Sequence, residues 1–180
     1  MFLILQYSIN IASQSSLIGA SGEHYVLSRL LRKGWVAALA PEGVPNTDII
    51  ITDVEGSKQF AIQVKTRSRG SDRGWHMSQK HEDIVSKTLV YCFVDMEDED
   101  VLPPVYLIPS KVVAQTLKES HQLWLDTPGR KGQKHNDTKM RRLQINCIHG
   151  KKCTPAQEKR LGEGWIDRYR ENWDIFNVQV

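Results

Sequence analysis

Residues 48–66 read DIIITDVEGSKQFAIQVKT, two apolar runs separated by the polar segment EGS. A short polar segment with a glycine between two β-prone runs is typical of a tight turn. The sequence therefore predicts strands at 48–54 and 59–66 that pair as a hairpin. Such a hairpin sets Asp48 opposite roughly Lys65, to within two residues of register.

Side chains on opposite faces of a strand alternate along the chain, so Gln63 and Lys65 point the same way. An ionised carboxylate at a strand end, here Asp48, can hold a hard divalent cation through oxygen. A lysine two residues past a second oxygen ligand can steady a nucleophilic water or a charged phosphate. These three residues predict a metal-dependent phosphodiesterase site.

A third carboxylate, Glu23, falls in a helix expected at 21–33, with Ser21 as its N-cap and Gly34 as its stop. The apolar stripe of this helix contains Val26, Leu27, Leu30 and Leu31. Glu23 precedes that stripe by helical spacings and shares its face. Because burying an unpaired carboxylate is costly, Glu23 needs a cation, a hydrogen-bond partner or a position at the rim. The alternative is that it only stabilises the helix N-terminus electrostatically.

The expected element order is helix 21–33, strand 36–40, the two hairpin strands, a short helix at 78–86 and strand 88–95. With these residues in these places, the chain resembles the PD-(D/E)XK nuclease superfamily over roughly residues 19–110. The core of that superfamily runs αβββαβ, with carboxylates on its second and third strands and often a glutamate on the first helix. The fold class expected is α/β, a restriction-endonuclease-like core with a mixed sheet and a C-terminal helical appendage.

The resemblance implies that Asp48 is a metal ligand, Gln63 stands in place of the usual acidic residue, Lys65 is the catalytic lysine and Glu23 is the helix carboxylate. It implies Mg²⁺ or Mn²⁺ as cofactor. Asn46–Thr47 replaces the nominal proline, and Gln63 offers an oxygen without a charge, which Glu23 can restore. Two functions follow from this: an endonuclease hydrolysing DNA, or a catalytically inactive module that binds nucleic acid or a partner protein.

Composition is that of one globular domain over residues 1–180, with 40% hydrophobic and 25% charged residues. The core is expected at about 19–110 and a basic, helical extension at about 111–180. Met1–Leu5 has neither a basic leader nor the length of a membrane span, so no anchor is expected. Three cysteines indicate a reducing compartment and a cytoplasmic protein. Cys147, His149 and Cys153 lack a fourth zinc ligand.

The net charge of +3 is uneven, because residues 101–180 hold 14 basic and 8 acidic side chains. Such an excess can follow a phosphate backbone, although a lysine-rich loop is often only a solvated surface. The expected partner is DNA or RNA, and a homodimer would supply the two sites that double-strand cleavage often needs. The predicted nucleic-acid contacts are Arg67, Arg69, Arg73, Arg130, Lys131, Lys134, Arg141 and Arg142.

Three further features have two interpretations each. Trp75 is either a core residue or a platform for a base, and His81 is either a proton carrier or a surface helix residue. Thr154–Gln157 has the form of a capping box at a helix start. The residues that follow at near-helical spacing, expected to pack on the sheet or form a dimer surface, are Trp165, Tyr169, Trp173 and Phe176.

Overall fold

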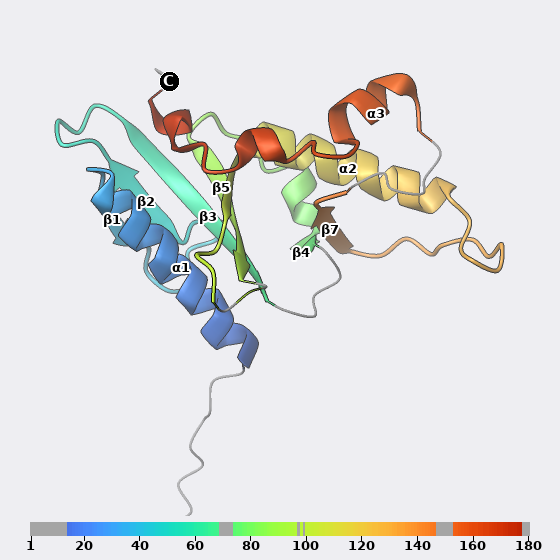
Figure 1. Ribbon diagram of the computed structural model, residues 1–180, viewed down its shortest axis with the longest axis horizontal. Coiled ribbons are helices and arrows are strands. Elements are labelled where there is room, and N and C mark those ends of the chain that lie inside the picture. Colours follow the sequence, from blue (N-terminus) through green and yellow to red (C-terminus); the bar gives the residue numbers. More distant parts are fainter. Residues whose placement is uncertain (1–13, 69–73, 97, 99, 147–152, 178–180) are drawn as a thin grey trace, which may run out of the picture.

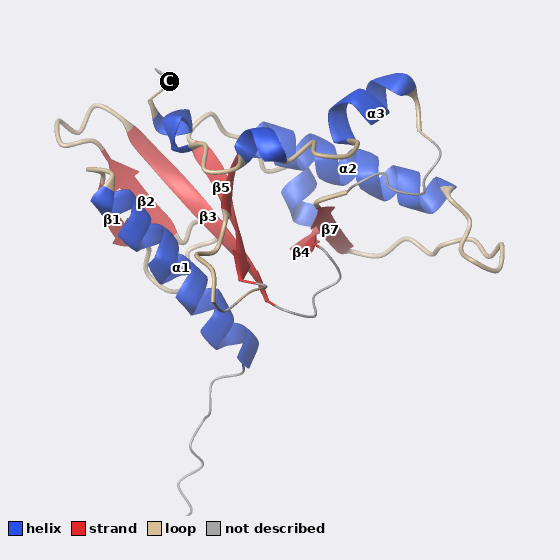
Figure 2. Ribbon diagram, in the orientation of Figure 1, coloured by secondary structure: helices blue, strands red, loops and turns tan. Residues whose placement is uncertain are grey.

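The computed structural model describes residues 14–68, 74–96, 98, 100–146 and 153–177 (Figure 1). A five-stranded sheet in the order β1-β2-β3-β5-β6 forms the centre. Its strands are β1 (Val36–Leu39), β2 (Ile49–Thr52), β3 (Gln59–Ser68), β5 (Leu89–Met96) and β6 (Val105–Pro109). A separate two-stranded sheet pairs β4 (Gly74–Ser78) with β7 (Met140–Gln144) (Figure 2).

The sheet is mixed, because β3 and β5 pair in parallel whereas the pairs β1–β2, β2–β3 and β5–β6 are antiparallel. The expected α/β fold with a mixed sheet is confirmed. The order of helix α1 (Gln14–Arg32), three strands and then β5 is also as expected. The short helix expected at 78–86 is a single 3₁₀ turn, η1 (Gln79–Glu82), and β4 precedes it as an extra strand.

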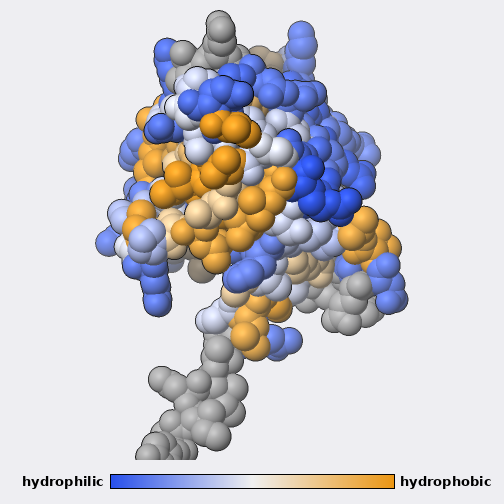
Figure 3. All heavy atoms as spheres, turned by 90° about the vertical axis from the view of Figure 1, so that its left-hand side faces the viewer, coloured by the Kyte–Doolittle hydropathy of each residue, from blue (hydrophilic) through white to orange (hydrophobic). Residues whose placement is uncertain are grey.

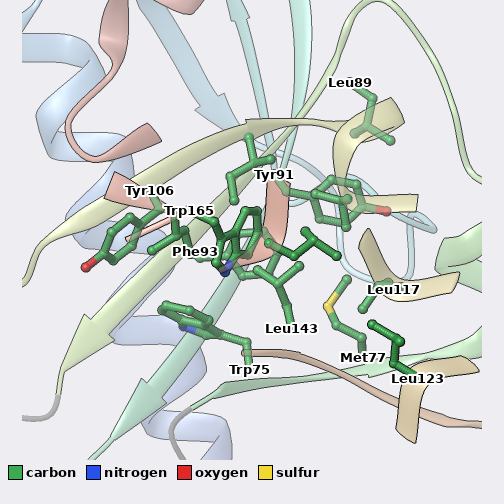
Figure 4. Packing of buried hydrophobic residues seen from close by; sticks show 14 residues of the cluster. Trp75, Met77, Leu89, Tyr91, Phe93, Tyr106, Leu117, Leu123, Leu143 and Trp165 are labelled. Carbon is green, nitrogen blue, oxygen red and sulfur yellow. The ribbon is translucent and has the colours of Figure 1, made fainter. Parts of the chain in front are cut away.

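Two apolar clusters cover the two faces of the sheet. On one face, Val26 and Leu30 of α1 pack with Phe60, Ile62 and Val64 of β3. On the other face, α2 (Ser110–Asp126) and the small sheet pack against β5, as Figure 4 shows for Trp75, Leu117 and Leu143 around Tyr91 and Phe93. Burial on both faces explains the unbroken apolar run of β5, the pattern of strands with parallel pairing. Trp75 is therefore a core residue, with its indole N–H donating to the Val94 carbonyl at 2.9 Å.

Helix α1 begins at Gln14, so the prediction of Ser21 as its N-cap is wrong. The Ser21 hydroxyl instead donates to the Ile18 carbonyl, one turn back, at 2.8 Å. Gly34, with φ of +88°, follows the helix end as expected. Leu31 is 51% exposed and is not part of the buried stripe.

The closest approach of α1 to the sheet is at Gly22, which is buried against Thr66 of β3. A Cβ atom at Gly22 would lie 1.9 Å from the Thr66 Oγ1. Only glycine allows this contact, and the contact sets the position of the neighbouring Glu23.

The C-terminal segment begins with α3 (Pro155–Leu161), and the expected capping box between Thr154 and Gln157 is present. The near-helical spacing from Trp165 to Phe176 does not correspond to one helix, because the chain makes two 3₁₀ turns, η2 (Asp167–Tyr169) and η3 (Trp173–Phe176), although these aromatic residues do pack on the sheet as expected. Between them Glu171 has φ of +52°, a conformation that no helix contains. None of the described helices has the length and apolar character to cross a membrane.

Apolar side chains gather on the outer surface that carries α1, β1 and β2 (Figure 3). Strand β1 is an edge of the sheet. The exposed apolar residues of this region include Leu17, Leu31, Val36, Leu39, Val44 and Ile50.

Candidate active site

Asp48 is fixed between β2 and β3 by backbone and side-chain hydrogen bonds. Its N–H donates to the Ile62 carbonyl at 2.8 Å, and its carbonyl accepts from Ala40 N–H at 2.8 Å. Its Oδ2 accepts from the Val64 N–H at 2.7 Å and from the Gln63 side-chain amide. Because Ile49 pairs with Ile62, Asp48 lies across from Gln63, two residues from the expected register with Lys65.

The three strand residues lie on one face of the sheet. Ile49 and Ile62 both belong to the cluster under α1, so their neighbours Asp48 and Gln63 point to the opposite face, and Lys65 follows Gln63 by alternation. Gln63 is 5% exposed. Burial lowers the pKa of Lys65, and the negative charges of Asp48 and Glu23 act against that shift. Lys65 thus lies within electrostatic range of both carboxylates.

Glu23 is half-buried, one residue beyond the contact of Gly22 with Thr66. Burial raises the pKa of its carboxyl, and the negative charge of Asp48 raises it further. The interpretation that Glu23 only stabilises the helix N-terminus is wrong, because α1 begins at Gln14 and that effect is confined to the first turn. The structure therefore brings Glu23 into the electrostatic neighbourhood of Asp48 and Lys65.

Among the described residues, no three His, Cys, Asp or Glu side chains form a metal-binding group. The oxygen donors available here are two carboxylates, Glu23 and Asp48, and the amide of Gln63. This donor set suits a hard cation such as Mg²⁺ or Mn²⁺. The mutual repulsion that raises the Glu23 pKa is also what a cation near both carboxylates would relieve. The residues present therefore fit the ion.

The Gln63 amide is oriented with Nε2 toward Asp48. In this orientation it donates to the carboxylate, and it must turn to present Oε1 to an ion shared with Asp48. The two amide orientations are nearly indistinguishable in shape, so the turn needs no change in packing.

The 3₁₀ turn η1 adds Lys80 to the site, a residue that the sequence analysis missed. Lys80 is exposed, and its charge lowers the pKa of Lys65. Nothing in the sequence links these two lysines, because their electrostatic interaction depends on how β4 returns the chain to the sheet.

His81, the next residue, is a core residue and not a surface helix residue. It is 4% exposed, and its Nδ1 lies 2.9 Å from the Tyr91 hydroxyl. Burial, with Lys65 and Lys80 nearby, lowers its pKa to about 4. His81 is therefore neutral at pH 7 and enclosed, which argues against its role as a proton carrier for a substrate.

Two predicted nucleic-acid contacts are wrong, because their guanidinium groups are buried in ion pairs. Arg67 pairs with Asp95 at 2.5 Å and lies 4.9 Å from the centre of the Trp75 ring. Arg141 is 4% exposed and donates to Glu82 and to the Thr138 carbonyl. Both arginines stabilise the fold.

The other predicted contacts divide into two groups. Arg130, Lys131 and Lys134 are exposed on the loop between α2 and β7, and Arg142 is half-exposed on β7. Arg69 and Arg73 lie outside the described residues, as do Cys147 and His149 of the zinc interpretation.

No family model and no curated protein matches this chain. Among solved structures, one similar chain is a bacterial homing endonuclease, I-Ssp6803I, with 16% identity, a TM-score of 0.49 and coverage of 91% of this chain and 93% of that one. Another is Hjc from Archaeoglobus fulgidus, a Holliday junction resolvase from an archaeal hyperthermophile. It has 15% identity, a TM-score of 0.42 and coverage of 81% of this chain and 96% of that one. Similarity at this level does not assign an activity.

Proposed function

We propose that this protein is a metal-dependent endonuclease that hydrolyses phosphodiester bonds of DNA. The observation that carries the proposal is that Asp48, Gln63 and Lys65 share one face of the sheet, with Glu23 of α1 within electrostatic range of Asp48 and Lys65. Asp48 and Gln63 are in direct contact, and the charges of Lys65 and Glu23 act on each other and on Asp48.

Asp48, Glu23 and Gln63 would hold Mg²⁺ or Mn²⁺ through oxygen. The bound cation lowers the pKa of a water ligand and polarises a phosphate oxygen. Both hydrogen bonds found for the Asp48 side chain go to Oδ2, which would leave Oδ1 for the cation. The Val64 N–H keeps the carboxylate oriented while the Gln63 amide turns.

Lys65 supplies the positive charge at the reacting phosphate. Lys65 is half-buried, which limits the positions open to its ammonium group. A positioned cation stabilises the charge that develops on phosphate oxygens in the transition state. Lys80 lies close enough to lower the Lys65 pKa and adds a second positive charge for the same polyanion.

A polymeric substrate is supported by the loop between α2 and β7. Three of its exposed cations, Arg130, Lys131 and Lys134, lie within five residues. The turn that carries them is closed by a hydrogen bond from Gly129 N–H to the Gln133 carbonyl at 2.9 Å. Gly132, with φ of +77°, makes the turn possible.

A second function, a binding module without cleavage, is favoured by one observation. The Gln63 amide donates to Asp48, so a group of the protein already satisfies this carboxylate oxygen. Cleavage and metal uptake distinguish the two functions.

The test is nicking of supercoiled DNA in Mn²⁺ by the parent and two variants, Asp48→Asn and Lys65→Ala. Each variant should lower the rate at least about a hundredfold, the usual effect of removing one electrostatic contact to a transition state. Glu55→Gln and Lys87→Ala make matching charge changes at exposed positions and should cleave like the parent. A parent protein that binds no Mn²⁺ in calorimetry and leaves DNA uncut would favour the binding module.

Gln63→Glu separates the two functions further. If Gln63 is an oxygen ligand in a working site, the added charge should tighten Mn²⁺ binding and retain nicking. Loss of both properties in this variant would show that the amide itself, as a donor to Asp48, is what the site requires.

A further inference from the structure

The small sheet is a two-stranded ribbon with one face in the core and one face outward. Burial alternates along both strands: Trp75 and Met77 of β4 are buried, as are Arg141 and Leu143 of β7. This alternation is typical of an antiparallel pair with a single solvated face. The inward residues belong to the cluster over β5 or, for Arg141, to the ion pair with Glu82.

The outward face carries polar side chains in direct cross-strand pairs. His76 faces Arg142, Ser78 faces Met140, and Gly74 faces Gln144. His76 and Met140 are exposed, and Ser78, Arg142 and Gln144 are half-exposed. The face therefore offers a guanidinium, an imidazole, an amide, a hydroxyl and a thioether side by side.

Gly74 fixes the position of the arginine on this face. A Cβ atom at Gly74 would lie 2.5 Å from the Leu143 carbonyl oxygen, 3.0 Å from Cγ and 3.2 Å from Cδ of Arg142. The aliphatic part of Arg142 thus lies flat across the glycine, which limits the directions in which its guanidinium can point.

We propose that the outward face of the β4–β7 ribbon enters the major groove of duplex DNA and reads base edges. This base-reading role rests on the proposed function. It specifies that the substrate is duplex DNA and that the protein prefers a particular sequence. The major groove admits a two-stranded ribbon, and its base edges are recognised by the groups present here. Arg142 suits a guanine, Gln144 an adenine, and the Met140 thioether the methyl group of a thymine.

The flanking residues suit this placement. The basic loop with Arg130, Lys131 and Lys134 runs directly into β7, so its cations can contact the phosphates beside the groove. At the other strand, β4 ends at Ser78 and leads within two residues to Lys80, which acts on Lys65. The chain thus connects backbone contacts, base contacts and the cleavage site in succession.

A pocket of about 230 Å³ lies next to the ribbon. It lies between α2 and β7, away from the four residues of the candidate active site. Its lining residues are Ser120, His121, Trp124, Thr138, Met140, Arg141, Arg142 and Gln144. Since three of these also belong to the outward face, the pocket borders that face on its β7 side.

The experiment is selection of bound duplexes from a randomised DNA pool in EDTA, which prevents cleavage during selection. The parent should enrich a sequence motif. Arg142→Ala should lose the preference at one or two adjacent base pairs by about 5- to 100-fold while the rest of the motif remains, the range for one bidentate base contact.

Lys131→Ala is the matched control, because it removes a cation from the loop and not from the ribbon. It should weaken binding to all sequences equally and leave the motif unchanged. The proposal is overturned if the parent binds duplex DNA and enriches no motif, or if Arg142→Ala, His76→Ala and Gln144→Ala all enrich the parent motif with the parent preference.

These results are independent of cleavage. A motif that depends on Arg142 in a protein that never nicks DNA would support the ribbon and reject the nuclease. Nicking that depends on Asp48, with no motif, would do the opposite. If a protein that does not bind the duplex pool retains binding to single strands, the major-groove proposal is rejected.

Discussion

Gly22→Ala tests whether the contact between α1 and β3 positions the catalytic carboxylate. The new Cβ would lie 1.9 Å from Oγ1, 3.0 Å from Cβ and 3.1 Å from Cγ2 of Thr66, so α1 must withdraw. Overpacking of this kind costs about 1–3 kcal/mol. Alanine also favours a helix interior over glycine by about 0.5–1 kcal/mol. The net expectation is destabilisation by about 1–2 kcal/mol, measured by urea unfolding.

Withdrawal of the helix also moves Glu23, the next residue, away from Asp48, so Mn²⁺-dependent nicking should fall more than the folded fraction does. Gly19→Ala is the control, because a Cβ there meets nothing within 4 Å. It should stabilise the protein by about 0.5–1 kcal/mol and leave nicking unchanged.

A second variant relieves the clash. Thr66→Ala removes Oγ1 and Cγ2, and Oγ1 is a buried atom without a hydrogen-bond partner in the described residues, so its loss should cost little. In the double variant, Gly22→Ala should cost at least about 1 kcal/mol less than it does alone. Equal costs in the two backgrounds, or a Gly22→Ala protein as stable as the parent, would refute the steric argument.

Three further outcomes are expected. Replacing Arg130, Lys131 and Lys134 by alanine should reduce the slope of log binding constant against log salt by about 3, measured by fluorescence anisotropy with duplex DNA. Arg141→Met leaves the partly buried Glu82 without its ion-pair partner and should cost up to about 3 kcal/mol in guanidinium unfolding. Because the pKa of His81 is lowered to about 4, the unfolded chain binds more protons than the folded one between pH 4 and 6.5. Stability should therefore fall by about 2 kcal/mol from pH 6.5 to 5, and His81→Phe should lose that part of the pH dependence.

The hairpin and the shared face of Asp48, Gln63 and Lys65 could be predicted because both depend on local rules. Turn residues set the loop, and alternation sets the faces, whatever the rest of the chain does. The helix stop at Gly34 and the capping box at Thr154 are local signals of the same kind.

Burial of charged residues could not be predicted in this way. Arg67 and Arg141 look like surface cations in a basic stretch, and their partners Asp95 and Glu82 are 28 and 59 residues away. Strands β4 and β7 pair although they are far apart in the sequence, and no local sequence pattern marks this pairing.

In two places the fold differs from what a local sequence signal predicts. Ser21 has the properties of an N-cap, but the chain before it continues the helix from Gln14. The aromatic residues from Trp165 to Phe176 have near-helical spacing but do not share one face of a helix, because Trp165 and Tyr169 pack on one face of the sheet and Trp173 and Phe176 on the other.

The path of that C-terminal segment links the stability of the two faces. Trp165 and Ile166 complete the cluster under α2, while Trp173 and Phe176 complete the cluster under α1. Between them the chain crosses the β6 edge, where Arg170 forms a bridge with Tyr106. Neither cluster can lose this segment without exposing the other, so both should open in one cooperative transition. Amide hydrogens beneath α1 and beneath α2 should then exchange with the same free energy of opening, and a single proteolytic cut at Gly164 should abolish protection in both.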